Sequence, residues 1–208
     1  MDIRYSEMLK WFQHNHPDQI WRYVESVSPN QLKSKFAIFK AIEEKQIVFP
    51  RDEDGKINVE IIGGWFGWPL IGMLIDLLGD DLNRIDFFEL DPFACKVLHK
   101  YIDVMKPIVD IRIFEMNWFN YKETRRSHVI INTSCEHMPD LISQKQYFIS
   151  PERTLLILTS NDKTNEPDHV NCKKTEQQLC EDNGCRMLAG DCLKMPGYKR
   201  FISIGKWT

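Results

Sequence analysis

The chain has 208 residues, 43% of them hydrophobic, and its 27 basic and 30 acidic side chains give a formal net charge of −3. A chain of this length buries one sizeable core rather than two. The near-neutral balance argues against a general attraction to nucleic acid, although it does not exclude a local basic patch. The longest apolar run, residues 70–78, is shorter than the roughly 20 residues of a membrane span, so we expect a cytoplasmic protein without membrane contact.

Helices are predicted throughout the first 50 residues, which we interpret as an N-terminal extension that acts as a lid or substrate cap. Its helical segments are YSEMLKWFQ, QIWRYVESV and PNQLKSKFAIFKAIEE. In the third segment Phe36, Phe39 and Ile42 recur at helical spacing, and Ser28 followed by Pro29 is a helix start signal.

Residues 51–208 show a different pattern, in which short apolar strands alternate with helical segments. This alternation is typical of a parallel sheet covered by helices on both faces. The predicted strands are Val59–Ile62, Ile85–Glu89, Ile111–Phe114, His128–Asn132 and Thr154–Thr159. We therefore expect one Rossmann-like α/β domain over residues 51–208.

The end of the chain predicts an antiparallel hairpin. The apolar segments Cys185–Leu193 and Phe201–Lys206 are joined only by KMPGYKR. Parallel neighbours need a crossover of about a dozen residues or more, so these two strands must run antiparallel. The predicted fold is a mostly parallel, seven-stranded sheet with a C-terminal antiparallel hairpin, an arrangement that a dehydrogenase domain does not ordinarily have.

A glycine-rich turn in the sequence VEIIGGWFGWP joins the first predicted strand to an apolar helix. Gly63, Gly64 and Gly67 let the backbone approach a ligand closely, and the N–H groups of the following helix offer a partly positive anchor. Asp91 closes the next strand near the spacing of about 20 residues at which an acid meets the ribose hydroxyls in Rossmann-type sites. Together these motifs predict an adenosine pocket.

The sequence from about Val59 to Trp207 resembles the class I methyltransferases that use S-adenosylmethionine, whose sheet ends in such a hairpin. The family's G-x-G-x-G turn is matched by residues 63–67, with Trp65 in place of the middle glycine. The family's acid two residues before the turn is not matched, because Ile61 stands there and Glu60 lies one position further back.

This resemblance implies a set of cofactor contacts on the turns that follow the strands. Asp91 would bind both ribose hydroxyls, and Phe93 would cover the adenine. Asn117 would bind the adenine amino group, with Trp118 as a stacking wall. The ring of Trp65 would close over the sulfonium by cation–π attraction.

The sequence NTSCEHMPDL, after the fourth predicted strand, is similar to the glutamate-histidine turn of many small-molecule methyltransferases. The resemblance puts Asn132, Glu136 and His137 beside the transferred group. A histidine can take a proton from the acceptor at neutral pH, and Glu136 would orient it or bind a substrate cation. The alternative is a helix-capping turn with His137 as a surface residue.

The segment SKFAIFKAIEE, together with the GGW-G turn and the ELDP strand end, resembles phage-encoded or environmental members of the same family. This resemblance implies that Ser34 and Lys35 fold over the cofactor, with the lysine near its carboxylate.

The cysteines do not predict a metal site. Cys172, Cys180, Cys185 and Cys192 fall near His169, but they form no C-x-x-C pair of the kind found in structural zinc sites.

Nucleic-acid methylation is also not supported by the sequence. Cys135 follows a serine, whereas the cysteine nucleophile of pyrimidine C5-methylating enzymes follows a proline. The sequence at residues 132–135 lacks the prolines and aromatic residue of the amino-methylating DNA enzymes.

We therefore predict a methyltransferase that uses S-adenosylmethionine and acts on a small molecule or metabolite. Its oligomeric state is not predicted. Two alternatives remain open: an enzyme that cuts, cyclises or transfers another part of the same cofactor, and a non-catalytic cofactor-binding subunit. A nicotinamide oxidoreductase is disfavoured, because the G-x-G-x-x-G pattern is incomplete and the terminal hairpin does not fit that fold.

Overall fold

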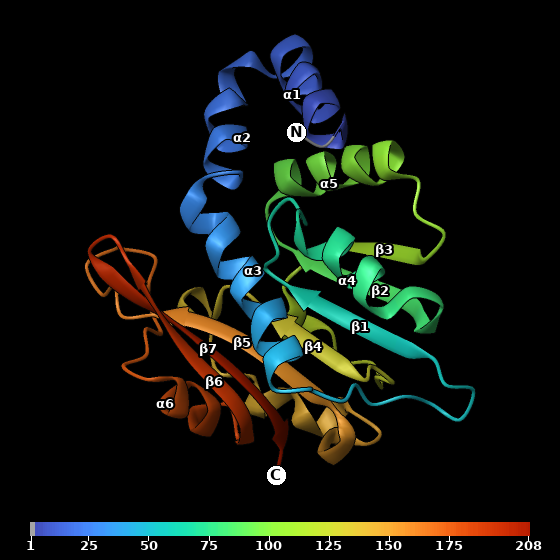
Figure 1. The fold of residues 1–208 in the computed structure, drawn as a ribbon, viewed down its shortest axis with the longest axis vertical. Coiled ribbons are helices and arrows are strands. Elements are labelled where there is room, and N and C mark those ends of the chain that lie inside the picture. The colour runs from blue at the N-terminus through green and yellow to red at the C-terminus, as the bar shows by residue number, and fades with distance from the viewer. Residues whose placement is uncertain (1–2) are drawn as a thin grey trace.

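The computed structural model of the chain, which describes residues 3–208, contains a seven-stranded sheet in the order β3-β2-β1-β4-β5-β7-β6 (Figure 1). The first five strands run parallel, and β7 is antiparallel to both β5 and β6. The strands are β1 (Ile57–Ile62), β2 (Leu82–Glu89), β3 (Asp110–Glu115), β4 (Val129–Asn132), β5 (Leu155–Asn161), β6 (Cys185–Met195) and β7 (Tyr198–Trp207). The predicted fold and its C-terminal hairpin are confirmed.

Helices cover the sheet on both faces. They are α1 (Ile3–Asn15), α2 (Ile20–Ser26), α3 (Pro29–Glu44), α4 (Leu70–Leu78), α5 (Pro92–Met105) and α6 (Glu176–Asp182). Figure 1 shows α1 beside α5. Helix α2 follows α1, and α3 follows α2 and crosses the sheet. Within residues 3–208, no helix combines the length and the apolar character that a membrane span requires.

The central strands are buried on both faces, which explains their unbroken apolar sequences. All residues of β4 and β5 are buried. Successive side chains alternate between two cores: Phe87 and Ile131 pack with α1, α3, α4 and α5, whereas Phe88 and Ile130 pack on the opposite side with α6.

The register of the strands brings three strand ends to one level. Ile62, the last residue of β1, pairs with Phe88 of β2 and with Asn132 of β4. The turns that follow β1, β2 and β4 therefore begin side by side at the carboxyl edge of the sheet, where open α/β folds bind ligands.

The third helix begins at its predicted start signal, because the Ser28 side chain accepts a hydrogen bond from the Gln31 N–H and Pro29 is the first helical residue. Its buried face differs from a purely apolar one. Ser34 and Lys35 are buried on α3, whereas Phe36 is 51% exposed. Polar groups on the buried side of a helix need partners, and here this side faces a cavity.

Candidate functional site

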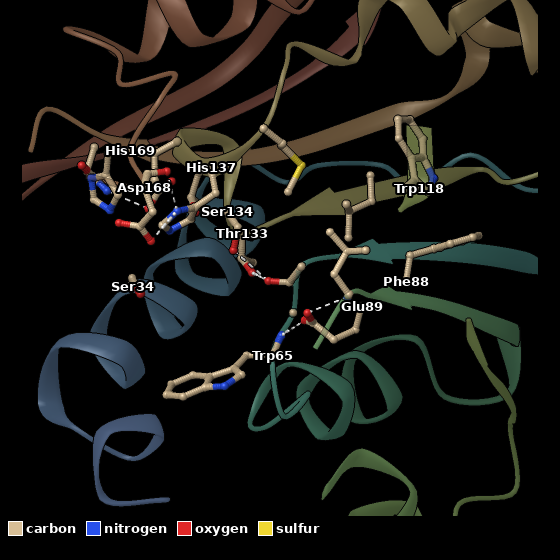
Figure 2. Close-up of a pocket in the computed structure, with 18 of the residues that line it drawn as sticks. Ser34, Trp65, Phe88, Glu89, Trp118, Thr133, Ser134, His137, Asp168 and His169 are labelled. Atoms are coloured by element: carbon tan, nitrogen blue, oxygen red, sulfur yellow. Dashed lines mark hydrogen bonds and ion pairs between the residues drawn. The ribbon is translucent and has the colours of Figure 1, made fainter. Parts of the chain in front are cut away.

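A cavity of about 740 Å³ opens at the carboxyl edge of the sheet, and its walls include the turns after β1, β2 and β4 (Figure 2). Its volume lies within the range of about 300–1,000 Å³ that is usual for small-molecule sites. Helix α3 contributes Gln31, Ser34, Lys35 and Ile38 to the wall.

The glycine turn forms one side of this cavity. Gly63, with φ +58°, donates its N–H to the Phe88 carbonyl at 3.0 Å. Its carbonyl accepts hydrogen bonds from the hydroxyls of Thr133, at 3.2 Å, and Ser134, at 2.8 Å (Figure 2). These bonds tie the turn after β1 to the turn after β4.

The second and third glycines of the turn serve its packing. A Cβ on Gly64 would lie 2.5 Å from Cζ of Phe87, and a Cβ on Gly67 would lie 2.6 Å from Cδ1 of Ile71. Gly64 lines the cavity, and Gly67 does not.

Trp65 occupies the left-handed region at φ +55°, a conformation that favours glycine. This explains why a glycine is usual at the middle of such a turn. The Trp65 ring lines the cavity and stacks on Phe66, with ring centroids 4.7 Å apart. The backbone N–H of Trp65 donates to Oε2 of Glu89 at 3.0 Å.

Glu89 is a site residue that the sequence analysis missed. It ends β2 and lines the cavity, and its Oε1 accepts the N–H groups of Leu90 at 2.8 Å and Asp91 at 3.1 Å. Burial raises the pKa of the Glu89 carboxyl, and the three backbone N–H groups act in the opposite direction. Three of its roughly four acceptor positions are used, which leaves the carboxylate able to accept from a ligand.

Asp91 does not line the cavity; it caps helix α5. Its Oδ1 accepts the N–H groups of Phe93 at 2.9 Å and Ala94 at 3.3 Å, and its Oδ2 is bound by Arg22 of α2. Burial acts to raise the pKa of Asp91, but the Arg22 hydrogen bond and the two N–H groups hold it below its usual value.

Phe93 also lies outside the cavity. Its ring sits under the Arg22 guanidinium at 5.0 Å and against His16, with ring centroids 5.2 Å apart. The structure therefore places Asp91 and Phe93 in the contact between α5 and the N-terminal helices.

Asn117 and Trp118 both line the cavity. Asn117 caps a short 3₁₀ helix, Trp118–Asn120, by accepting the Phe119 N–H at 2.9 Å. Trp118 is 2% exposed, and its indole N–H donates to Oε2 of Glu60 at 2.6 Å.

Glu60 is bound within the core rather than in the cavity. It pairs with the buried Arg125 at 3.4 Å and accepts the Ser127 hydroxyl at 2.6 Å. Burial raises the pKa of the Glu60 carboxyl, while Arg125, Ser127 and Trp118 oppose this effect. Glu60 therefore does not take the place of the family's acid before the glycine turn, whose position Ile61 occupies.

The turn after β4 ends in a 3₁₀ helix, Cys135–His137. Asn132 is fully buried and outside the cavity, where its Oδ1 accepts the Ser134 N–H at 2.9 Å and shapes the turn. Burial raises the pKa of the Cys135 thiol well above its usual value, which leaves it an inert core residue.

Glu136 and His137 both line the cavity. Glu136 is 2% exposed, and its Oε1 accepts hydrogen bonds from Asn161 at 2.7 Å and Arg200 at 3.2 Å. His137 is exposed at the mouth of the cavity, with Nδ1 3.1 Å from Oδ2 of Asp168. Asn161, Asp168 and Arg200 come from β5, the following loop and β7, and no motif in the sequence marked them.

Lys35 presents a buried ammonium group to the same cavity. It is 5% exposed, and its Nζ donates to Oε1 of Gln31 at 3.3 Å. Burial, together with the charge of Arg200, lowers the pKa of Lys35 to about 8. An anionic group of a ligand would relieve both effects.

The fold is that of the class I methyltransferases, as comparison with solved structures shows. N-methyltransferase NodS from Bradyrhizobium japonicum WM9, in complex with S-adenosyl-L-homocysteine, matches with a TM-score of 0.65 and 13% identity over 99% of this chain and 98% of that chain. Magnesium protoporphyrin IX methyltransferase (ChlM) from Synechocystis PCC 6803, with bound SAH, matches with a TM-score of 0.59 and 14% identity over 99% and 100%. A SAM-dependent methyltransferase from Aquifex aeolicus matches with a TM-score of 0.60 and 13% identity over 87% and 94%. No protein-family model and no curated protein sequence matches this chain.

Proposed function

We propose that this protein is a methyltransferase that binds S-adenosylmethionine in the cavity at the carboxyl edge of the sheet and methylates a small molecule. The fold and the bound ligands of NodS and ChlM support the choice of cofactor. The observation that carries the proposal is Glu89, a carboxylate fixed by three backbone N–H groups in the cavity wall beside the glycine turn.

In this proposal Glu89, rather than Asp91, accepts a hydrogen bond from a ribose hydroxyl. The two acids lie two positions apart at the end of one strand, but Asp91 is engaged by Arg22 and by the N-terminus of α5, outside the cavity. Glu89 lines the cavity, where a carboxylate hydrogen bond to a hydroxyl contributes about 1.5–3 kcal/mol.

Lys35 would bind the methionine carboxylate of the cofactor. Its buried ammonium group has a single neutral hydrogen-bond partner, Gln31, among the described residues. Through Lys35 and Ser34, α3 closes one side of the cavity, which supports the role of residues 1–50 as a lid or cap. Asn117 and Trp118 would form the adenine end, with Trp65 near the sulfonium.

Methyl transfer from a sulfonium needs alignment of the acceptor and removal of its proton. Alignment contributes several kcal/mol, and a base contributes about 10²–10⁴ in rate. His137 is the proposed base, because it lies in the cavity wall with Nδ1 beside the Asp168 carboxylate, which favours a basic Nε2. The cavity has a volume usual for small-molecule sites, which supports a small acceptor.

Calorimetric titration with S-adenosylhomocysteine tests the cofactor assignment. Glu89→Gln keeps the side-chain volume but removes the charge, and we expect affinity to fall about tenfold or more. Asp91→Asn is the matched control and should bind the ligand as the native chain does. The assignment is wrong if Asp91→Asn weakens binding and Glu89→Gln does not.

A further inference from the structure

Three metal-ligating side chains converge on one wall of the cavity. Glu136 and His137 lie in the turn after β4, and His169 lies in the loop between β5 and α6. One ligand atom from each lies within 4.8 Å of the other two. Figure 2 shows the two histidines on the same wall, with Asp168 between them. We propose that these three residues bind a divalent transition-metal ion.

The hydrogen bonds of both imidazoles prepare them as ligands. Nδ1 of His137 lies 3.1 Å from Oδ2 and 3.2 Å from the carbonyl oxygen of Asp168, and Nδ1 of His169 lies 2.7 Å from the carbonyl oxygen of Lys163. These oxygens accept hydrogen bonds, so each Nδ1 carries the proton and each Nε2 keeps its lone pair. Metal-binding histidines are oriented in this way in known sites.

The third ligand, Glu136, has a carboxylate oxygen that lacks a partner. Oε2 of Glu136 is buried and has no hydrogen-bond partner among residues 3–208. The other oxygen, Oε1, is held by Asn161 and Arg200, so these two residues orient the carboxylate without covering Oε2. Buried carboxylate oxygens normally have a partner, and an ion bound by the two histidines would supply it.

The donor set points to a transition metal rather than to magnesium or calcium. Two imidazoles and one carboxylate suit zinc, iron or manganese, whereas Mg²⁺ and Ca²⁺ prefer oxygen ligands. Ligand atoms around a tetrahedral zinc ion lie roughly 3.3 Å apart, so binding requires the three groups to approach one another by up to about 1.5 Å. His169 is on a loop and the His137 side chain is exposed, which permits this movement.

Three protein ligands would leave one coordination position of the ion open for an acceptor hydroxyl. This role of the ion rests on the proposed methyl transfer. With the ion bound, Nε2 of His137 would serve as a ligand instead of as the base. The ion would lower the pKa of the acceptor hydroxyl, and the proton of that hydroxyl would pass to solvent. The oxygen lone pair then forms the new bond to the methyl carbon. The carbon–sulfur bond breaks with its electron pair on sulfur, so the sulfonium becomes a neutral thioether. The binding of the ion itself does not depend on this reaction.

Calorimetric titration of chelator-treated protein with Zn²⁺ tests the site, with Mn²⁺ as the second probe. We expect one site per chain, with affinity at least tenfold lower in both Glu136→Gln and His169→Ala. Asp168→Asn should lower affinity about 10- to 100-fold through the orientation of His137. His99→Ala removes an exposed histidine of α5 and should leave binding unchanged.

Circular dichroism and thermal melting of each variant show whether its fold is intact, and His169→Asn serves as the milder second variant. Zinc binding that persists unchanged in Glu136→Gln and His169→Asn would overturn the site, as would the absence of stoichiometric binding to the native chain. A parallel titration of the metal-free protein with S-adenosylhomocysteine tests the proposed function separately.

Discussion

The backbone N–H of Trp65 donates a 3.0 Å hydrogen bond to the Glu89 carboxylate, which joins the turn after β1 to the end of β2. The bond fixes the carboxylate at the cavity wall and holds Trp65 at φ +55°. A non-glycine residue in this conformation costs about 1–3 kcal/mol, so the turn keeps a strained tryptophan whose ring lines the cavity.

Replacement of Trp65 should separate this strain from the function of the ring. Trp65→Gly removes the strain and Trp65→Ala retains it, so we expect the glycine variant to have a free energy of unfolding about 1 kcal/mol higher than the alanine variant. Urea unfolding measures this difference. Both variants lose the ring and should bind S-adenosylmethionine about 2- to 30-fold more weakly, as expected for a lost cation–π contact. Equal affinity in Trp65→Ala and the native chain would exclude that contact.

Lys35 predicts a pH dependence of stability. Its pKa is about 8 in the folded chain and 10.5 ordinarily. Between these values the unfolded chain holds the proton and the folded chain does not, so the free energy of unfolding rises with pH across this window. Below pH 8 the buried charge destabilises the fold by about 3 kcal/mol. Relative to the native chain, Lys35→Met should be more stable at pH 7, and this advantage should disappear near pH 10.5 in urea titrations.

The same residue predicts a pH dependence of cofactor binding. If Lys35 holds the cofactor carboxylate, S-adenosylhomocysteine affinity of the native chain should fall as pH rises above about 8, because the lysine loses its charge. The affinity of Lys35→Met should be lower at pH 7 and should lack this decline. Calorimetry at several pH values gives both results, and parallel profiles in the two proteins would contradict the assignment.

Gly64 predicts a packing defect at the turn. A Cβ at this position would lie 2.5 Å from Phe87, a fully buried core side chain. We expect Gly64→Ala to lower the free energy of unfolding by about 1–3 kcal/mol. Gly72 is the matched control: it lies within α4, and its Cβ would meet nothing closer than 3.7 Å. Gly72→Ala should raise stability by about 0.5–1 kcal/mol.

The fold was predictable because its central strands, such as β4 and β5, are buried on both faces and therefore have unbroken apolar sequences. The seven-residue link KMPGYKR excluded a crossover, and this fixed the antiparallel hairpin. Several predicted site residues line the cavity because they lie in the turns after β1 and β4, whose last residues pair with each other. These residues are Gly63, Gly64, Trp65 and Glu136.

The remainder of the site depends on contacts between distant parts of the chain. Asp91 is held at the cap of α5 and is bound there by Arg22, which comes from α2, and Glu89 is the acid of the ELD sequence that lines the cavity. Local spacing does not carry this information. Arg200 and His169 reach the cavity from β7 and from the loop after β5, where no motif marks them.

Incubation with S-adenosylmethionine labelled with deuterium on its methyl group, in the presence of a small-metabolite extract, tests the central claim most directly. Mass spectrometry should detect S-adenosylhomocysteine together with a small molecule that carries the labelled methyl group, and both should decrease with Glu89→Gln. Formation of methylthioadenosine without a labelled acceptor, or S-adenosylmethionine recovered intact, would contradict the account.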